Sequence, residues 1–455
     1  MQNARRVAVI GAGPVGLAAA AHALERGLEP IVLEAGPSVG HAVRQWSHVR
    51  MFSPWRYDVD SASERLLNKA GWNSPDPDHY PSGVELVEHY LEPLAALPEL
   101  RSRIETRARV TAIARAGFDK VKTRGREHAP FEVRYRNGKG DAIAQADAVI
   151  DASGTWFGPN PAGANSLEAI GEADHQNRIS YGMPDVLGAA RERYAGKTVA
   201  VLGAGHSAIG TIIDLKRLQG DHPETRVIWV LRSENPEKSF GGGASDQLAA
   251  RGELGQAFAH IVKAGGVQME AGFRLSHIGS GRHGKLRLSA GSASGGRHVL
   301  ADELIVATGF RPDLSFLREV RIALDPALEC SPILAPLIDP NLHSCGTVRP
   351  HGARELAHPE PDFYLAGMKS YGRAPTFLLK TGYEQARSIM AEIAGDHEAA
   401  RRVELTLPET GVCNGPITAA DEVGCCGGPA IADQLACCKA DEAAKSAGLG
   451  GCGCK

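Results

Sequence analysis

The chain has 455 residues, of which 53 are glycine and 5% are aromatic, and its formal net charge is −3. Its length allows two or three domains, and the small negative charge provides no basic field to attract nucleic acid or an anionic membrane. No apolar run reaches the roughly 20 residues that a helix needs to cross a bilayer. We therefore expect a globular protein with many turns between strands and helices.

The first clear pattern begins close to the first residue. The apolar residues at 7–10 predict a short β-strand, and an Ala-rich segment at 17–26 predicts a helix after it. Between them stand Gly11, Gly13 and Gly16 in the spacing Gly-x-Gly-x-x-Gly. The first glycine permits a tight turn, the second lets the backbone approach a pyrophosphate, and the third lets helix and strand pack closely. The stretch predicts a dinucleotide site with phosphates at the helix N-terminus.

An acidic residue follows at the distance that a ribose requires. A second strand is expected at 30–33, and Glu34 follows it, 23 residues after Gly11. A carboxylate there accepts hydrogen bonds from the ribose hydroxyls of a dinucleotide. Because the glycines match the dinucleotide pattern, we do not interpret the basic and apolar start of the chain as a signal peptide, and we expect a cytoplasmic enzyme.

The next stretch, 40–60, has no clear periodicity and contains Gln45 and Trp46. Loops that follow the ribose acid in flavoproteins often close over the flavin ring, so both residues are candidate cofactor contacts. An ordinary surface loop is the alternative interpretation.

The middle of the first region predicts one helix and several strands. An amphipathic helix is expected at 83–97, and strands at 107–113 and 131–135 are expected to form a β-meander. A buried strand at 146–150 then leads into Gly154, which we assign to cofactor binding.

A second dinucleotide pattern begins with a strand at 198–202 and a helix at 208–218. Alanine is allowed at the third glycine position of the pattern. The turn residues that we assign to cofactor binding are Gly203, Gly205, Ser207 and Ala208. The next strand, at 227–231, ends at Arg232 and not at an acid. A cation there suits the 2′-phosphate of NADPH, and a solvated strand end is the alternative.

Two dinucleotide sites in one chain indicate electron transfer between two nucleotides. The usual arrangement has FAD in the first site and NADPH in the second. A strand expected at 301–307 leads into Thr308 and Gly309, a last strand ends at Gly367, and a closing helix is expected at 376–394. We assign these three residues to cofactor binding.

The chain resembles the two-dinucleotide-domain flavoproteins, and among them it is most similar to the class B flavin monooxygenases. The resemblance rests on the two glycine patterns and on the stretches at 151–154 and 307–310. Between its glycine patterns that family carries Phe-x-Gly-x-x-x-His. This chain keeps Gly171 and His175 but has Ala169 in the place of Phe. The resemblance implies His175 as a catalytic candidate, and a loop histidine is the alternative.

The resemblance also implies the fold class and the order of the domains. We expect an α/β protein with two Rossmann-like dinucleotide-binding domains in a glutathione-reductase-like arrangement and a small Cys-rich C-terminal tail. The FAD-binding domain is expected at 1–165 and 305–398, the inserted NADPH-binding domain at 170–304, and the tail at 403–455.

The competing relatives are disulfide reductases of the thioredoxin-reductase type. They need a Cys-x-x-Cys pair beside the flavin, because electrons must leave the ring through thiols. This chain contains no Cys-x-x-Cys. Those reductases also hold the flavin with a Gly-Asp pair after the last strand, where this chain has Gly367 and Met368. Both differences favour the monooxygenase interpretation.

A finer resemblance is carried by the stretches at 345–351 and 367–376 together with the paired cysteines of the tail. They are similar to the flavin-binding monooxygenase-like proteins of arsenic-resistance gene clusters. That resemblance implies Lys369, Tyr371 and Arg373 as candidates for contact with flavin or substrate. Without it, these residues are interpreted as a polar loop.

The end of the chain holds most of the cysteines, seven of nine. The candidate ligands are Cys425, Cys426, Cys437, Cys438, Cys452 and Cys454. Vicinal thiols suit a soft ion such as trivalent arsenic better than zinc, because structural zinc sites typically use Cys-x-x-Cys arms. Thiol redox chemistry, or no ligand, are the alternatives.

These observations predict an FAD-dependent NADPH oxidoreductase that uses O₂ to oxidise a small soft nucleophile, with a trivalent arsenical as the specific candidate. Two alternatives stay open: an NADPH-dependent flavoprotein reductase of a thiol or metal(loid) that uses the tail cysteines, and a non-catalytic metalloid-binding flavoprotein. No nucleic-acid or membrane partner is expected, and assembly into a homodimer is left open.

Overall fold

A computed structural model describes residues 4–240, 249–291, 296–341, 351–375 and 377–405. The described chain divides into two compact units, which we call unit 1 (4–156 and 311–405) and unit 2 (157–310). The chain passes from one unit to the other after Trp156 and after Phe310, near the predicted boundaries at 165 and 305. Apart from 403–405, the predicted tail lies outside the described residues.

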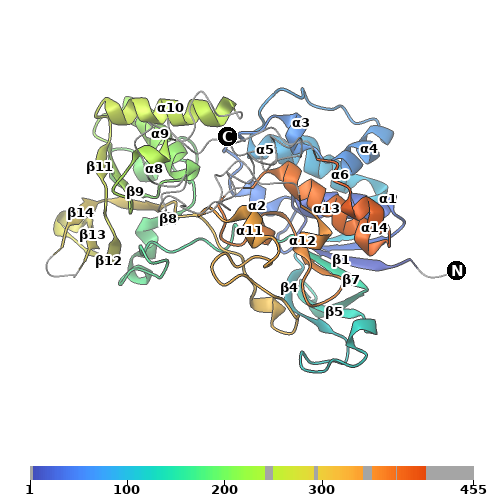
Figure 1. Ribbon diagram of the computed structural model, residues 1–455. Helices are drawn as coiled ribbons and strands as arrows, with labels where there is room; N and C mark the ends of the chain where they lie inside the picture. The colour runs from blue at the N-terminus through green and yellow to red at the C-terminus, as the bar shows by residue number, and fades with distance from the viewer. Residues whose placement is uncertain (1–3, 241–248, 292–295, 342–350, 376, 406–455) are drawn as a thin grey trace, which may run out of the picture. The chain divides into compact units, whose positions relative to one another are not determined.

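Unit 1 is built on a parallel sheet with the strand order β16-β7-β1-β2-β3 (Figure 1). Its strands are β1 (Arg6–Ile10), β2 (Glu29–Leu33), β3 (Ile104–Glu105), β7 (Ala148–Asp151) and β16 (Phe363–Leu365). β1 is buried on both faces, because Val7 and Val9 join one hydrophobic cluster and Ala8 and Ile10 join another. A strand in the middle of a parallel sheet between two layers is expected to be apolar in this way.

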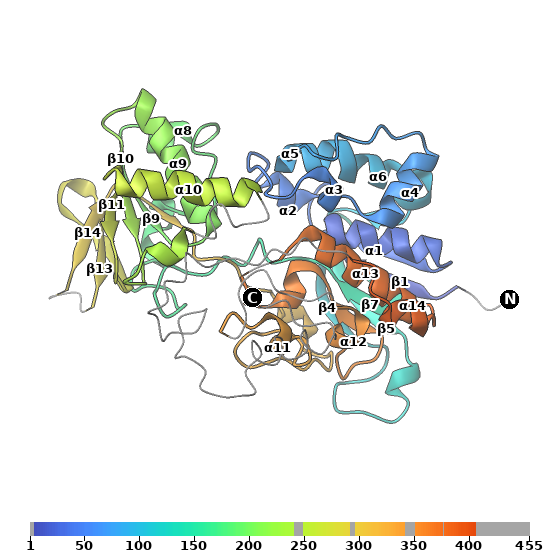
Figure 2. The same ribbon diagram turned by 45° about the horizontal axis from the view of Figure 1, so that its top comes forward.

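Helices cover one face of this sheet. They are α1 (Pro14–Glu25), α2 (His41–Arg44), α3 (Trp55–Asp58), α4 (Ser61–Lys69), α5 (Gly83–Leu86), α6 (Glu92–Ala96), α7 (Pro98–Arg101), α11 (Ala335–Ile338), α12 (Ala353–Leu356), α13 (Leu379–Ile393) and α14 (His397–Arg401). α1 and α13 lie side by side (Figures 1 and 2). Tyr383, Ile389 and Ile393 of α13 join the same cluster as β1, which confirms the apolar face predicted for the closing helix. The helix predicted at 83–97 is present as α5, a π turn at Val87–Leu91 and α6.

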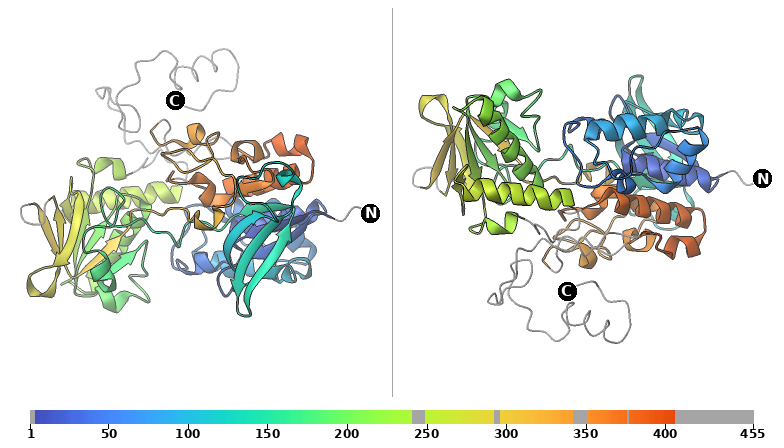
Figure 3. Two further views of the ribbon diagram at one scale, coloured as in Figure 1. Left: turned by 90° about the horizontal axis from the view of Figure 1, so that it is seen from below. Right: turned by 90° about the horizontal axis from the view of Figure 1, so that it is seen from above.

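A three-stranded antiparallel sheet covers the other face. Its strands are β4 (Arg109–Arg115), β5 (Phe131–Asn137) and β6 (Gly140–Ala146), drawn in teal in Figure 3. Ile113, Phe131 and Val133 pack in one cluster with Ala8 and Ile10 of β1. The structure therefore confirms the predicted β-meander and places it against the parallel sheet.

Unit 2 repeats this plan. Its parallel sheet has the order β11-β10-β9-β15-β8, and a second, antiparallel sheet has the order β12-β13-β14. The strands are β8 (Ile179–Tyr181), β9 (Thr198–Leu202), β10 (Arg226–Val230), β11 (Gln268–Glu270), β12 (Leu275–Ser280), β13 (Leu286–Ala290), β14 (His298–Ala301) and β15 (Glu303–Val306), and the helices are α8 (Arg191–Tyr194), α9 (His206–Asp221) and α10 (Ala249–Lys263). Trp229 of β10 packs edge-on against Phe258 of α10, with ring centroids 4.7 Å apart. No helix in the described part of the chain is long and apolar enough to span a bilayer.

The strand expected at 301–307 is present as β15, which is shorter than predicted. Ala301 is the last residue of β14 in the antiparallel sheet, and β15 begins at Glu303 in the parallel sheet. Asp302 lies between them and turns the chain. Its N–H donates to the carbonyl oxygen of Thr198 (2.7 Å), and its carboxylate accepts from the N–H of the same residue (2.8 Å). The two consecutive acids Asp302 and Glu303 interrupt the apolar sequence at this bend.

Candidate dinucleotide sites

The turn after β1 has the shape that a pyrophosphate requires. Gly11 has a φ of +95°, and a Cβ there would lie 2.9 Å from the carbonyl oxygen of Ala152. A Cβ on Gly16 would lie 2.0 Å from the carbonyl oxygen of Gly11, so both positions require glycine. At Gly13, which precedes α1, a Cβ would have no atom within 4 Å. The turn is closed toward the protein and open in front of the helix N-terminus, where phosphate oxygens bind.

Glu34 directly follows β2 and is held in one orientation. Its two carboxylate oxygens accept the N–H groups of Ala12 and Gly36, each at 2.7 Å. The residue is only 8% exposed. Each oxygen retains acceptor capacity beyond the bond that it already makes. The fixed carboxylate fits the predicted contact with ribose hydroxyls.

The strand order locates the crevice of this sheet. β1 lies between β2 and β7, and in open α/β sheets ligands bind at the carboxyl ends of the strands where the order reverses. That point is between β1 and β7. Gly154, in the loop after β7, has a φ of +70° and open space where a Cβ would stand. The glycine turn, Glu34 and Gly154 thus share one edge of the sheet and can hold FAD.

Two of the three residues predicted to contact flavin or substrate are buried. Lys369 and Tyr371 lie in a 3₁₀ turn at Gly367–Tyr371, and their exposures are 0% and 2%. The ring of Tyr371 packs edge-on against Phe377, with centroids 5.0 Å apart, and burial raises the pKa of the Tyr371 hydroxyl well above its usual value. This burial favours a role in shaping the turn over direct contact with a substrate.

The same turn is tied to α13. The N–H of Gly367 donates to Gln385 Oε1 (2.7 Å), and Gln385 Nε2 donates to Ser370 Oγ (2.9 Å). Arg373, the third candidate contact, is half-buried, and its N–H donates to the carbonyl oxygen of Leu328 (2.7 Å). The predicted residues of this segment therefore belong to one fixed piece of backbone at the carboxyl end of β16.

The two candidates from the loop at 40–60 differ in their surroundings. Gln45 is exposed at the end of α2, whereas Trp46 is half-buried. A Cβ on Gly83 would lie 2.8 Å from the Trp46 ring, so this ring packs closely on the start of α5. Of the two, Gln45 is the side chain left available for a ligand.

Unit 2 carries the second glycine turn, after β9. Gly203 has a φ of +141°, and its carbonyl oxygen accepts the indole N–H of Trp229 at 2.8 Å. Gly205 precedes α9 and has open space where a Cβ would stand. Ser207 is half-buried and Ala208 is fully buried. This turn can hold a second nucleotide in the same way as the first.

Arg232 is exposed two residues beyond β10. Its Nη1 donates to the carbonyl oxygen of Ala164 at 3.0 Å, and the guanidinium has further N–H groups for a phosphate. Thr308 Oγ1 donates to the carbonyl oxygen of Asn160 (3.1 Å), and Gly309 follows with a φ of +88°. These last two residues lie in the segment by which the chain leaves unit 2.

His175 lies in unit 2, in a turn that is held by hydrogen bonds between its own residues. Its Nδ1–H donates to the carbonyl oxygen of Gly171 (2.8 Å). The neighbouring Glu172 is fully buried, accepts the N–H groups of Ala162 and Ala169, and accepts the hydroxyl of Tyr181 at 2.6 Å. These contacts support the interpretation of this segment as structure that folds the loop before β8.

The predicted metal ligands of the tail, Cys425, Cys426, Cys437, Cys438, Cys452 and Cys454, lie outside the described residues. Within the described ranges, no group of three or more His, Cys, Asp or Glu side chains is arranged to hold a metal ion.

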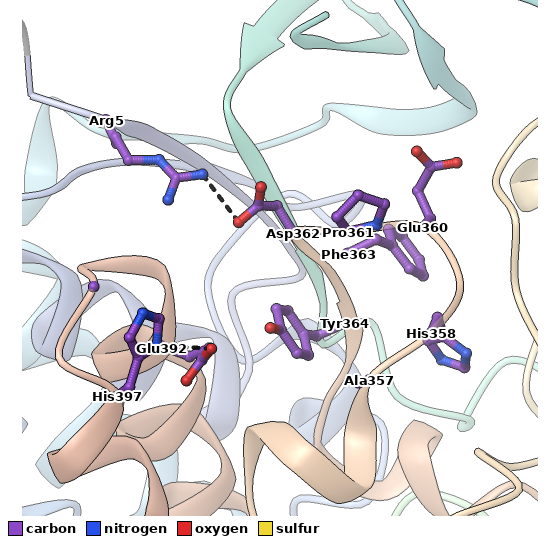
Figure 4. A pocket seen from close by; sticks show the side chains of 11 residues that line it. Arg5, Ala357, His358, Glu360, Pro361, Asp362, Phe363, Tyr364, Glu392 and His397 are labelled. Atoms are coloured by element: carbon purple, nitrogen blue, oxygen red, sulfur yellow. Dashed lines mark ion pairs between the residues drawn. The ribbon is translucent and has the colours of Figure 1, made fainter. Parts of the chain in front are cut away.

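A hollow of about 370 Å³ lies on unit 1 away from the glycine turn (Figure 4). Its lining includes Arg5 and Asp362, whose side chains form an ion pair of 2.9 Å. These residues directly precede β1 and β16. The hollow therefore lies at the amino ends of the strands, and the dinucleotide crevice lies at the carboxyl ends.

Sequence reasoning did not identify three polar residues at the carboxyl edge of unit 1. Asp151 and Ser153 contact Lys369 there, and Gln385 fixes the turn after β16. Asp151 could have been recognised in the sequence, because it ends the otherwise apolar strand β7. A buried carboxylate needs a partner, so an acid at such a position indicates an interaction within the fold.

The chain matches the family model described as pyridine nucleotide-disulphide oxidoreductase over residues 8–331. None of the curated proteins compared with it matches in sequence. Among solved structures it is similar to bacillithiol disulfide reductase from Bacillus cereus, with 18% identity, a TM-score of 0.61, and coverage of 87% of this chain and all of that chain.

Two monooxygenases are similar in the same way. The cadaverine monooxygenase of desferrioxamine biosynthesis from Erwinia amylovora has 14% identity and a TM-score of 0.59, with 90% of this chain and 99% of that chain covered. A mutant flavin monooxygenase from Stenotrophomonas maltophilia has 20% identity and a TM-score of 0.53, with 87% and 99% covered. At these identities the likeness concerns the fold.

Proposed function

The chain belongs to the pyridine nucleotide-disulphide oxidoreductase family and is an NAD(P)H-dependent flavoprotein oxidoreductase with FAD and NADPH as cofactors; on that premise we propose that it is a flavin monooxygenase. In this proposal FAD binds unit 1, NADPH binds unit 2, and O₂ is the oxidant. The substrate class is a small soft nucleophile, and the resemblance of the sequence to proteins of arsenic-resistance gene clusters makes a trivalent arsenical the specific candidate.

The observation that carries the choice of monooxygenase is that the thiol pair used by reductases of the thioredoxin-reductase type is not found. The sequence has no Cys-x-x-Cys. In the described part of the chain the one cysteine is Cys330, which is fully buried, and burial raises the pKa of its thiol to about 12. A buried thiol of that pKa is a poor nucleophile. In our proposal electrons therefore pass from the flavin to a soluble acceptor, and that acceptor is O₂.

FAD supplies two-electron transfer between NADPH and an oxidant when it is bound. The chain's own residues bind and orient it. The N–H groups at the start of α1 would bind the phosphates, Glu34 would accept hydrogen bonds from the ribose hydroxyls, and the loop after β7 would flank the cofactor. In unit 2, the N–H groups at the start of α9 would bind the phosphates of the second nucleotide, and Arg232 would bind its 2′-phosphate.

The test is anaerobic reduction with NADPH followed by admission of oxygenated buffer, with NADPH consumption, hydrogen peroxide and product measured together. A monooxygenase is expected to form one oxygenated product per NADPH when a matching nucleophile is present, with little peroxide. The panel would include a trivalent arsenical, a thioether and a diamine. Consumption of NADPH that yields only peroxide with every member would contradict the proposal.

The second candidate function is an NADPH-dependent reductase of a thiol or metal(loid). It is favoured by the similarity to bacillithiol disulfide reductase and by the tail cysteines. It predicts that disulfide or metalloid acceptors speed reoxidation without O₂, and that Cys-to-Ser changes in the tail abolish this turnover. A non-catalytic metalloid-binding flavoprotein would contain FAD and oxidise NADPH negligibly with any acceptor.

Arg232→Ala is expected to raise the KM for NADPH by roughly 10- to 100-fold, because a charged hydrogen bond to a phosphate contributes about 1.5–3 kcal/mol. The KM for NADH, which lacks the 2′-phosphate, should change little. Arg282→Ala, an exposed arginine of the same unit, is the matched control. Equal effects on the two nucleotides would remove Arg232 from the 2′-phosphate site.

A further inference from the structure

A closed ionic cluster lies at the carboxyl ends of β7 and β16. Lys369 Nζ lies 2.6 Å from Asp151 Oδ2, and neither side chain has any exposed surface. Lys369 Nζ also donates to Ser153 Oγ (2.9 Å), and Ser153 Oγ donates to Asp151 Oδ1 (2.7 Å). The ring of Phe316 covers the ammonium, with its centroid 4.5 Å away. The cluster is thus balanced in charge and shielded from water.

The cluster joins two segments that contact the first glycine turn. Asp151 is the last residue of β7 and Ser153 belongs to the loop after it, and the backbone of that loop lies where a Cβ on Gly11 would stand. Lys369 belongs to the turn after β16. A Cβ on Gly367 of that turn would lie 3.3 Å from Val15, in the first turn of α1. The ion pair therefore fixes both flanks of the turn that faces the pyrophosphate.

Stability alone does not account for a buried ion pair, because its desolvation cost can exceed the Coulomb gain and well-packed apolar residues often serve as well. We propose that Lys369 and Asp151 are positioning residues of the FAD site. The pair holds the loop after β7 against the Gly11 turn, and its balanced charge prevents an unpaired charge beside an anionic cofactor. Lys369 acts through the loop, since it has no surface with which to touch a ligand. The inference rests on the assignment of FAD to unit 1.

The test uses two single variants that leave opposite charges behind. Lys369→Met leaves the Asp151 carboxylate unpaired, and Asp151→Asn leaves the ammonium unpaired. Buried charges act strongly on nearby groups, so the first variant should lower the midpoint potential of bound FAD and the second should raise it. The dissociation constant for FAD should rise by roughly tenfold or more in Lys369→Met, because the added repulsion and the lost link both weaken binding.

The double variant Asp151→Asn with Lys369→Met separates the effect of an unpaired charge from the effect of losing the link between the two segments. It also provides a neutral site if a single variant fails to fold. Its potential should return toward that of the native protein, while its affinity for FAD stays reduced because the link is absent. Lys285→Met, which breaks the Lys285–Asp302 pair of unit 2 (3.2 Å), is the control and should change neither quantity.

A purely structural role would give a different result. Both single variants would then lower the melting temperature, while the potential and the FAD affinity of the folded fraction would equal those of the native protein, and this outcome would overturn the inference. Failure of the FAD assignment itself is distinguishable, because Gly13→Asp would then also leave FAD binding unchanged.

Discussion

Gly13→Asp is expected to abolish stable FAD binding while leaving the fold intact. The position precedes α1, has a φ of −81° that any residue adopts, and has no atom within 4 Å of where a Cβ would stand. Asp is among the best residues at this helix position, so the apoprotein should unfold at the native temperature or above it. A carboxylate in front of the helix N-terminus would occupy the place of a phosphate and repel the others. Since like charges in contact cost several kcal/mol, the dissociation constant should rise by about 100-fold or more.

The measurement is FAD titration of the apoprotein followed by flavin fluorescence, with thermal unfolding of the same samples. Gly138→Asp is the matched control, because Gly138 is an exposed glycine of unit 1 that also has open space where a Cβ would stand. Native affinity in Gly13→Asp would show that the phosphates bind elsewhere.

Asp58→Asn is expected to stabilise the protein at pH 8 by up to about 4 kcal/mol and to have little effect at pH 4. Asp58 is fully buried, and burial raises the pKa of its carboxyl to about 7, although the hydroxyl of Ser53 donates to its Oδ1 at 2.6 Å. Its Oδ2 is buried without a hydrogen-bond partner. The largest expected gain in the free energy of unfolding follows from the difference between a pKa of about 7 in the folded state and about 3.9 in the unfolded state, because each pKa unit corresponds to about 1.36 kcal/mol.

The sign follows from the proton balance. The folded state holds this proton up to about pH 7, whereas an unfolded Asp releases it near its ordinary pKa of about 3.9. The free energy of unfolding therefore falls as the pH rises from about 4 through 7 and is lowered by a constant amount above that range. Asn keeps the acceptor for Ser53 and carries no charge, so the variant should lack this part of the slope.

Denaturant unfolding of both proteins at several pH values between 4 and 8.5 measures the difference. Subtracting the two curves removes the contributions of other groups, such as Asp60. Burial raises the pKa of Asp60, but the charge of His22 and the hydrogen bonds from His22 and Ser63 together lower it below its usual value. Asp174→Asn makes the same charge change at an exposed residue. A stability difference that does not change with pH would contradict the expectation.

The parts of the site that the sequence predicts are those fixed by local geometry. Gly11, Gly13 and Gly16 are recognisable because a backbone turn imposes both residue type and spacing over a few positions. The second turn, at Gly203, follows the same rule. The burial of Lys369 could not be predicted, because its partner Asp151 is more than 200 residues away in the sequence. A lysine in a polar stretch gives no local sign that a distant carboxylate will enclose it.

The pattern of apolar residues likewise predicts where strands occur, but it does not predict which sheet each strand joins. β14 and β15 are separated by the single residue Asp302, and its two hydrogen bonds to Thr198 accompany the passage of the chain from one sheet to the other. The candidate contacts Lys369 and Tyr371 lie after the carboxyl end of β16, and the sequence predicts this position because it places them just after a strand. Their depth depends on the packing of β7 and α13, which no single segment encodes.

The discontinuity of unit 1 has a consequence for biosynthesis. Unit 2 comes from one continuous stretch, so the ribosome delivers all of its strands together and it can fold as the chain emerges. The folding of unit 1 cannot be completed until β16 and α13 have been translated. Both come more than 200 residues after β7, which pairs with β16. Until then β7 presents an unpaired edge, and Asp151 at its end has no counterion. We therefore expect the nascent chain to be prone to aggregation through this strand edge until β16 has been translated, and a chaperone would protect it during that time.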